Sequence, residues 1–144
     1  MTRPIRALVA LTALLCLLAP APPAAAQDAG AFEVELNKLE PAGPACRTYF
    51  VFRNGTEMAV SNLRLDLFLF DAEGVILSRV AIDSEAVAPG RTRVRVFELA
   101  GLDCGAIGSL LMNGVMACEG EMGPLSGCVG RLSVSSRAEA ELLD

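Results

Sequence analysis

The chain has 144 residues with 12 basic and 17 acidic side chains, and it contains no histidine. Its net charge of −5 argues against a nucleic-acid partner, because an acidic surface repels phosphate backbones. Without histidine the chain lacks the base of the usual serine and cysteine hydrolases and a preferred ligand of catalytic zinc. A serine–lysine pair would depend on Lys38, the only lysine. We therefore expect a protein without enzymatic activity and without a cofactor.

The first 26 residues have the order of a secretory signal peptide. Arg3 and Arg6 precede an apolar run over 7–19, and a proline-broken segment then leads to three alanines before Gln27. This pattern predicts cleavage after about Ala26 and a periplasmic or secreted protein, and the alanine- and proline-rich composition points to a bacterium. The apolar run is shorter than the roughly 20 residues of a transmembrane helix, and we expect no membrane span in the mature chain.

Alternating apolar and polar residues predict a single domain of short strands over 27–136. Phe32, Val34 and Leu36 share one face of the first strand, and four leucines alternate with other residues over 63–70. Asn-Gly and Pro-Gly dipeptides mark turns between strands. Seven strands without a long helix indicate an all-β fold, an immunoglobulin-like antiparallel β-sandwich. We expect these strands at 32–36, 46–53, 63–70, 75–82, 92–96, 107–118 and 128–135, and then a tail over 137–144 that is frayed or forms one or two helical turns.

Four cysteines follow the predicted cleavage site, and an even number in an exported chain is typical of disulfides. Three pairings are possible. We favour Cys118–Cys128, because their spacing suits a loop between neighbouring strands, and this choice leaves Cys46–Cys104 as the second bridge. The chain has no C-x-x-C motif, which argues against a zinc knuckle and against thiol–disulfide exchange.

One stretch of about 50 residues, Tyr49 to Glu98, resembles the bacterial FxLYD domains. Leu67-Phe68-Leu69-Phe70-Asp71 is similar to the motif that names the family, with leucine in place of its phenylalanine. Phe50 to Asn54, Gly74 to Leu77 and Val87 to Gly90 are similar to flanking positions of that family. The resemblance implies an immunoglobulin-like fold and a general role as an extracytoplasmic binding or packing module, and it implies no active site.

Three arginines form the most concentrated charge of the chain. Arg91, Arg93 and Arg95 are spaced by two, so they project from one face of a strand. They are candidate contacts for an anion or an acidic partner. The favoured alternative is a solvated outer face, on which they pair with carboxylates such as Glu33 and Glu35 of a neighbouring strand.

A bridge between Cys118 and Cys128 would staple the loop over 119–127, which carries Met122 and Leu125. A constrained loop loses less entropy on binding, so these two residues are candidate partner contacts. A plain structural hairpin is the alternative.

Two patterns raise the question of a metal ion. Asp71, Glu73 and Gly74 have some features of a calcium loop, but further carboxylates at the required spacing are missing, and we favour a hairpin turn. Thioethers such as those of Met112, Met116 and Met122, near Cys118, can bind copper(I), although packing is their common use. We expect no metal site.

These patterns predict an exported, non-catalytic binding or accessory module that contacts another protein or an envelope component. Two alternatives stay open. The first is a protein inhibitor that presents the 119–127 loop to an enzyme cleft, and the second is a carrier of a small ligand or a metal ion.

Overall fold

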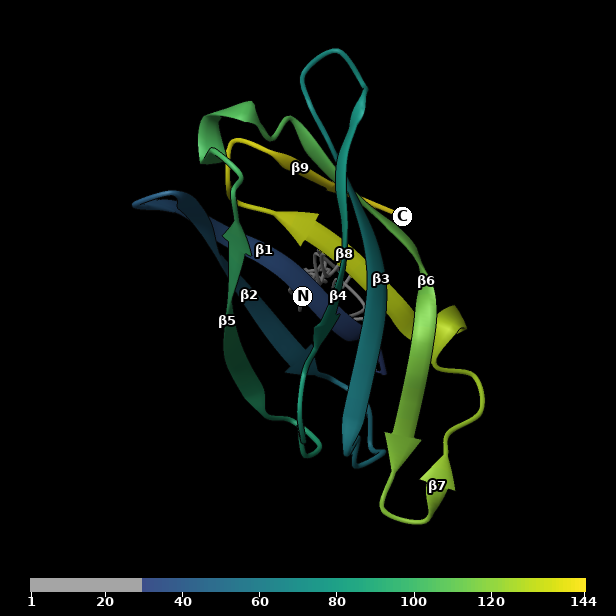
Figure 1. Cartoon of the computed structure of the whole chain (residues 1–144). Helices are drawn as coiled ribbons and strands as arrows, with labels where there is room; N and C mark the ends of the chain where they lie inside the picture. The colour runs from purple at the N-terminus through teal and green to yellow at the C-terminus, as the bar shows by residue number, and fades with distance from the viewer. Residues whose placement is uncertain (1–29) are drawn as a thin grey trace, which may run out of the picture.

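A computed structural model describes residues 30–144, so the predicted signal peptide over 1–26 lies outside the described residues. Within 30–144 the chain forms two β-sheets of an immunoglobulin-like sandwich (Figure 1). Sheet 1 has the strand order β5–β2–β1–β8, with bounds Thr92–Ala100, Ala45–Asn54, Phe32–Ala42 and Leu132–Ser136. Sheet 2 has the order β4–β3–β6–β7, with β9 also paired to β6, and its bounds are Ile76–Asp83, Asn62–Phe70, Ser109–Gly120, Gly123–Pro124 and Glu141–Leu143.

The seven expected strands are present, and the described chain adds two short ones, β7 and β9. The expectation of a helical or frayed tail is wrong, because β9 pairs in parallel with the start of β6. The last long strand begins at Leu132 rather than Cys128, since a short 3-10 helix, η2 (Val129–Arg131), precedes it. β8 also pairs in parallel, with β1, so the sandwich is not purely antiparallel.

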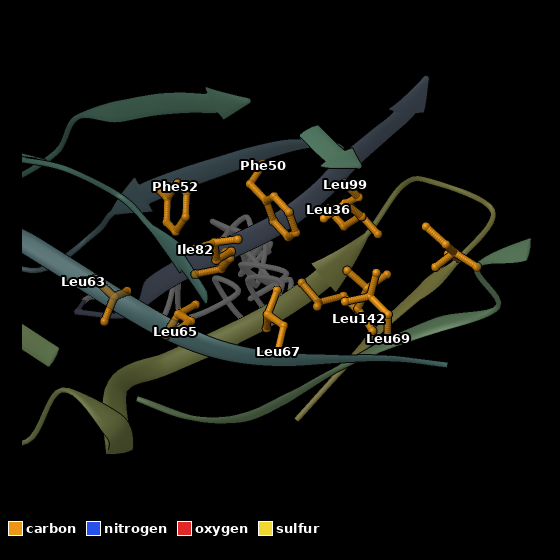
Figure 2. Close-up of a cluster of buried hydrophobic side chains, with 14 of the residues drawn as sticks. Leu36, Phe50, Phe52, Leu63, Leu65, Leu67, Leu69, Ile82, Leu99 and Leu142 are labelled. Atoms are coloured by element: carbon orange, nitrogen blue, oxygen red, sulfur yellow. The ribbon is translucent and has the colours of Figure 1, made fainter. Parts of the chain in front are cut away.

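The core lies between the two sheets and follows the predicted alternation (Figure 2). Phe32, Val34 and Leu36 are buried from β1, as expected. Sheet 2 contributes the four leucines of β3, while Arg64 between two of them is exposed. Each fully buried leucine contributes about 2 kcal/mol of transfer free energy. Because the four leucines occupy every second position, they determine which face of β3 points toward the core. The buried aromatic and aliphatic side chains labelled in Figure 2 come from both sheets: Leu36, Phe50, Phe52, Leu63, Leu65, Leu67, Leu69, Ile82, Leu99 and Leu142.

Asn54, at the end of β2, joins two loops at one end of the sandwich. Its side chain is buried, and Nδ2 donates to the carbonyl oxygens of Met58 (2.8 Å) and Val87 (2.9 Å). Oδ1 accepts hydrogen bonds from the backbone nitrogen and the hydroxyl of Thr56 at 3.0 and 2.6 Å. One amide thus satisfies polar groups of the β2–β3 loop and of the β4–β5 loop, where no water competes.

Both predicted disulfides are present, and each joins a strand of one sheet to a segment that leads into the other sheet. Cys46 in β2 pairs with Cys104, the first residue of the 3-10 helix η1 (Cys104–Ala106) that leads into β6. Cys118 in β6 pairs with Cys128, which directly precedes η2 and β8. The expectation that the second bridge joins neighbouring strands is therefore wrong, because β6 and β8 lie in different sheets.

Candidate functional site

The stapled loop over 119–127 is built around a tight hairpin. Glu119 pairs with Pro124 and Gly120 with Gly123, which leaves Glu121 and Met122 at the tip. The Met122 side chain is fully exposed. Contact between Met122 and a partner stays a prediction.

Leu125, the other candidate of this loop, has a different role. Its backbone nitrogen donates to the Cys118 carbonyl at 2.9 Å, and its half-buried side chain packs against the core. Gly120 makes room for it, because a Cβ there would lie 2.9 Å from a Leu125 methyl group. Leu125 therefore fixes the loop on the body of the protein, while Met122 faces solvent.

A groove of about 400 Å³ runs beside the disulfide, between β6 and the segment that follows β7. Val115, Met116 and Ala117 line one wall, and Leu125 and Val129 are part of the other. The side chains of Met116 and Val129 are 55% and 67% exposed, although both are apolar. We call Met116, Met122, Val129 and this groove the stapled-loop surface. Its volume lies in the usual range of ligand clefts, about 300–1,000 Å³.

A second, smaller hollow lies under the same disulfide. Its volume is about 10 Å³, and Phe32, Met58 and Leu63 are among the residues that line it. A space of this size holds at most one water molecule. It therefore offers no room for a small organic ligand.

The arginines of β5 face the opposite sheet. Arg93 donates to the Glu85 carboxylate at 3.0 Å, and Arg95 donates to Asp83 Oδ1 at 3.1 Å and also pairs with Glu85. The expected pairing with Glu33 and Glu35 is therefore wrong. Arg93 and Arg95 close one side of the sandwich between β5 and the end of β4, so carboxylates of this chain already occupy both guanidinium groups.

Arg91 differs from the other two arginines. Its side chain is exposed, and it forms no ion pair with any residue of 30–144. The outer face of β5 carries Val94 and Val96 instead of the arginines, and both valines are exposed. Whether any of the three arginines contacts a partner stays a prediction.

Glu35 of β1 occupies a charged cluster that the sequence did not indicate. The residue is 4% exposed, and its carboxylate accepts hydrogen bonds from Asn37 (2.8 Å), Arg137 (3.1 Å) and Arg53 (3.2 Å). The Asn37 hydrogen bond, followed by those from the two arginines, lowers the pKa of Glu35 to about 2 against the opposing effect of burial. The cluster ties β1 to β2 and to the segment after β8, so its role is structural.

Asp71 and the cysteines, which were among the candidates for metal binding, have other partners. Asp71 Oδ1 accepts hydrogen bonds from the backbone nitrogens of Glu73 (3.1 Å) and Val75 (2.7 Å), and Gly74 has a φ of 82°. This confirms the predicted hairpin turn. The four cysteines are consumed in disulfides. Within 30–144 no three residues among histidine, cysteine, aspartate and glutamate are grouped as a metal site requires.

No helix in the described part of the chain is long and apolar enough to cross a membrane. Comparison with protein families finds no matching family model, and no curated protein matches the chain. Among solved structures, IrmA from Escherichia coli is similar, with a TM-score of 0.57 and 16% identity over 73% of this chain and 91% of that chain. At this identity the likeness concerns the fold alone. The resemblance to FxLYD domains has no matching family model behind it and stays a prediction.

Proposed function

We propose that the chain is an exported, non-catalytic module of a bacterial envelope that binds another protein through the stapled-loop surface. The observation that carries this proposal is the exposure of three large apolar side chains, Met116, Met122 and Val129, around one disulfide. Exposed apolar surface next to a groove is typical of interaction sites. Methionine is well suited to such a surface because its flexible thioether adapts to a partner.

The Cys118–Cys128 bridge supports the same function. It fixes the ends of the loop, and Leu125 holds the middle of the loop on the core. A partner would therefore meet a preorganised surface and would lose less of its binding energy to ordering. The predicted signal peptide, the two disulfides and the resemblance to FxLYD domains support a location in the periplasm or outside the cell for this activity.

Site-specific photo-crosslinking in the native envelope tests the proposal. A photo-reactive amino acid is placed at Val129 or at Met122, and a matched control carries it at Val75, an apolar residue of the β3–β4 turn that is 60% exposed. We expect a protein adduct of defined mass from positions 129 and 122 and none from position 75. Adducts of equal yield at all three positions, or none at any, would contradict the proposal.

A second candidate function, inhibition of an enzyme, follows from the position of Met122. A fully exposed side chain at the tip of a disulfide-fixed hairpin has the shape that enters an active-site cleft. If the crosslinked partner is an enzyme, the protein is expected to inhibit it, and Met122→Asp should weaken the inhibition at least tenfold. Unchanged inhibition by this variant would exclude insertion of the tip. Leu125→Asp is a poor test, since Leu125 packs on the core.

A further inference from the structure

One edge of β6 is covered only at its two ends. On the side away from β3, β9 pairs with Ser109–Leu111 and β7 pairs with Glu119–Gly120. The Cys118 carbonyl accepts a hydrogen bond from Leu125. Between these contacts, no strand within residues 30–144 pairs with Met112–Ala117 on that side (Figure 1). We call these six residues the free β6 edge, which is about 20 Å long at the usual rise of a strand.

The free β6 edge lacks the charges that protect other edges of this protein. The sequence of the segment is Met-Asn-Gly-Val-Met-Ala. The outermost strand of sheet 1, β5, carries Arg93 and Arg95, and the outermost strand of sheet 2, β4, carries Arg79 and Asp83. The other outer strand of sheet 1, β8, is only five residues long. Charged side chains keep sheet edges from pairing with other chains. The free β6 edge and the five-residue β8 carry none, and of the two only the free β6 edge lines the groove.

The groove of the stapled-loop surface lies along this edge. Its lining includes Val115–Glu119 of β6 together with Leu125 and Val129. A bound strand satisfies backbone hydrogen-bonding groups and places every second side chain in such a groove. Glu119 is the one charged residue that lines the groove, and Glu121 follows in the hairpin. These carboxylates favour a basic side chain at that end of the ligand.

We propose that the free β6 edge binds an extended segment of a partner protein as an added strand, with alternate apolar side chains in the groove and a basic residue at its Glu119 end. This inference rests on the proposed binding function and specifies how the partner is recognised. The proposed ligand is a flexible peptide segment of another protein, not a folded surface and not a second copy of this chain.

Two β-bulges on β6 bear directly on the proposal. The register with β3 shifts at two points, so Asn113 and Met116 are extra residues without a register partner on β3, although the Asn113 side chain donates to Asp66 of β3 at 2.8 Å. A bulge re-aims a side chain, and the Met116 side chain faces solvent at the groove. Bulges also serve to keep an edge unpaired in some sheets, and the experiment below separates the two roles.

The test selects ligands from a phage-displayed library of random heptapeptides on the immobilised, disulfide-bonded protein. Met116→Lys places a charge on the free β6 edge, and Val75→Lys places the same charge on a remote residue of similar exposure. We expect enriched peptides with alternating apolar residues and a basic end. Synthetic copies should bind the wild type and Val75→Lys equally and should bind Met116→Lys at least tenfold more weakly. Methylation of one peptide nitrogen that faces the edge should weaken binding about threefold to tenfold, as expected for the loss of one hydrogen bond.

Amide hydrogen exchange locates the bound peptide. Added protection at Met112–Ala117 is the expected result. No enrichment over an empty surface, equal binding to Met116→Lys, or protection confined to β5 or β4 would overturn strand addition, and the bulges would then be protective. A peptide-free dimer in light scattering that Met116→Lys dissociates would identify a second copy as the ligand and would also overturn the proposal. If position 129 still crosslinks to a partner in the envelope while no peptide binds, the proposed function stands and only its mode is wrong.

Discussion

Removing either disulfide is expected to destabilise the protein by an amount that depends on the length of the loop it closes. Cys118–Cys128 spans a sequence separation of 10 and Cys46–Cys104 a separation of 58. The loop-closure model gives about 3 kcal/mol for the shorter loop and about 4 kcal/mol for the longer one. Cys46 is also fully buried, so its truncation to alanine adds a cavity cost of about 1 kcal/mol.

The magnitudes translate into melting temperatures that calorimetry resolves. At about 4 °C per kcal/mol for a domain of this size, we expect Cys118→Ala/Cys128→Ala to melt roughly 10 °C lower. Cys46→Ala/Cys104→Ala is expected to melt roughly 20 °C lower. The wild type should show a large drop in melting temperature when a reductant is added, and the variant with no bridge at all should show none.

Two results would refute this reasoning. Identical melting of the oxidised and reduced wild type would show that the bridges do not stabilise the fold. A greater loss from the shorter loop than from the longer one would show that loop closure is not the source of the stability. Hydrogen exchange provides a local control, because loss of Cys118–Cys128 should speed exchange in 119–127 more than in the β3 core.

Three further variants test contacts described above. The folded-state pKa of Glu35, about 2, lies below its ordinary value of 4.5, so its carboxylate stabilises the fold above pH 4.5, and this contribution is lost as the pH falls toward 2. Because the arginines of the cluster are partly exposed, we expect a loss of about 1–2 kcal/mol in urea unfolding between pH 5 and pH 2.5, and a flatter profile for Glu35→Gln. Asn54→Asp should cost about 3 kcal/mol or more at pH 7, because a carboxylate cannot donate to two carbonyls, and an equal stability of Asp and Asn forms would refute the role of the amide. Glu85→Ala should lower stability by less than about 1 kcal/mol at low salt and by nothing measurable in 1 M NaCl, and a larger, salt-independent loss would contradict a surface ion pair.

The sequence predicted those parts of the fold that depend on local alternation. The four leucines of β3, the turn at Asp71–Gly74 and the seven expected strands all follow from period two and from turn residues, whereas β7 and β9 were not predicted. The pairing of the cysteines was also predicted, although for a reason that the sheet arrangement contradicts. Local patterns determine which residues share a face, and they do not determine which strands become neighbours.

The orientation of Arg93 and Arg95 was not predicted, because the expected fifth strand ended too early, at Val96. A fifth strand that ends at Val96 leaves Val94 and Val96 as its apolar face. The strand continues to Ala100, and Leu99 is buried. Because Leu99 is in phase with Arg93 and Arg95, all of them must point toward the other sheet. A strand extended by four residues would have predicted this orientation.

The stapled-loop surface was predicted only in part. Met122 is exposed as expected, but Met116, Val129 and the free β6 edge were not identified as one surface. The gap along β6 exists because β8 pairs with β1 in sheet 1, while β9 covers only Ser109–Leu111 of β6. The sheet that a strand joins depends on contacts between residues distant in sequence, and a window of a few residues does not reveal those contacts.

The parallel pairing of β1 with β8 bears on how fast the protein reaches its native state. Leu36 and Ser136 are register partners, 100 positions apart along the chain. Folding rates fall as the mean sequence separation of contacts grows, so this ladder is expected to form late, after the β1–β2 and β3–β4 hairpins. Until it forms, the outer edge of β1 is open to other chains. During that interval the newly made polypeptide is most vulnerable to aggregation and to proteolysis.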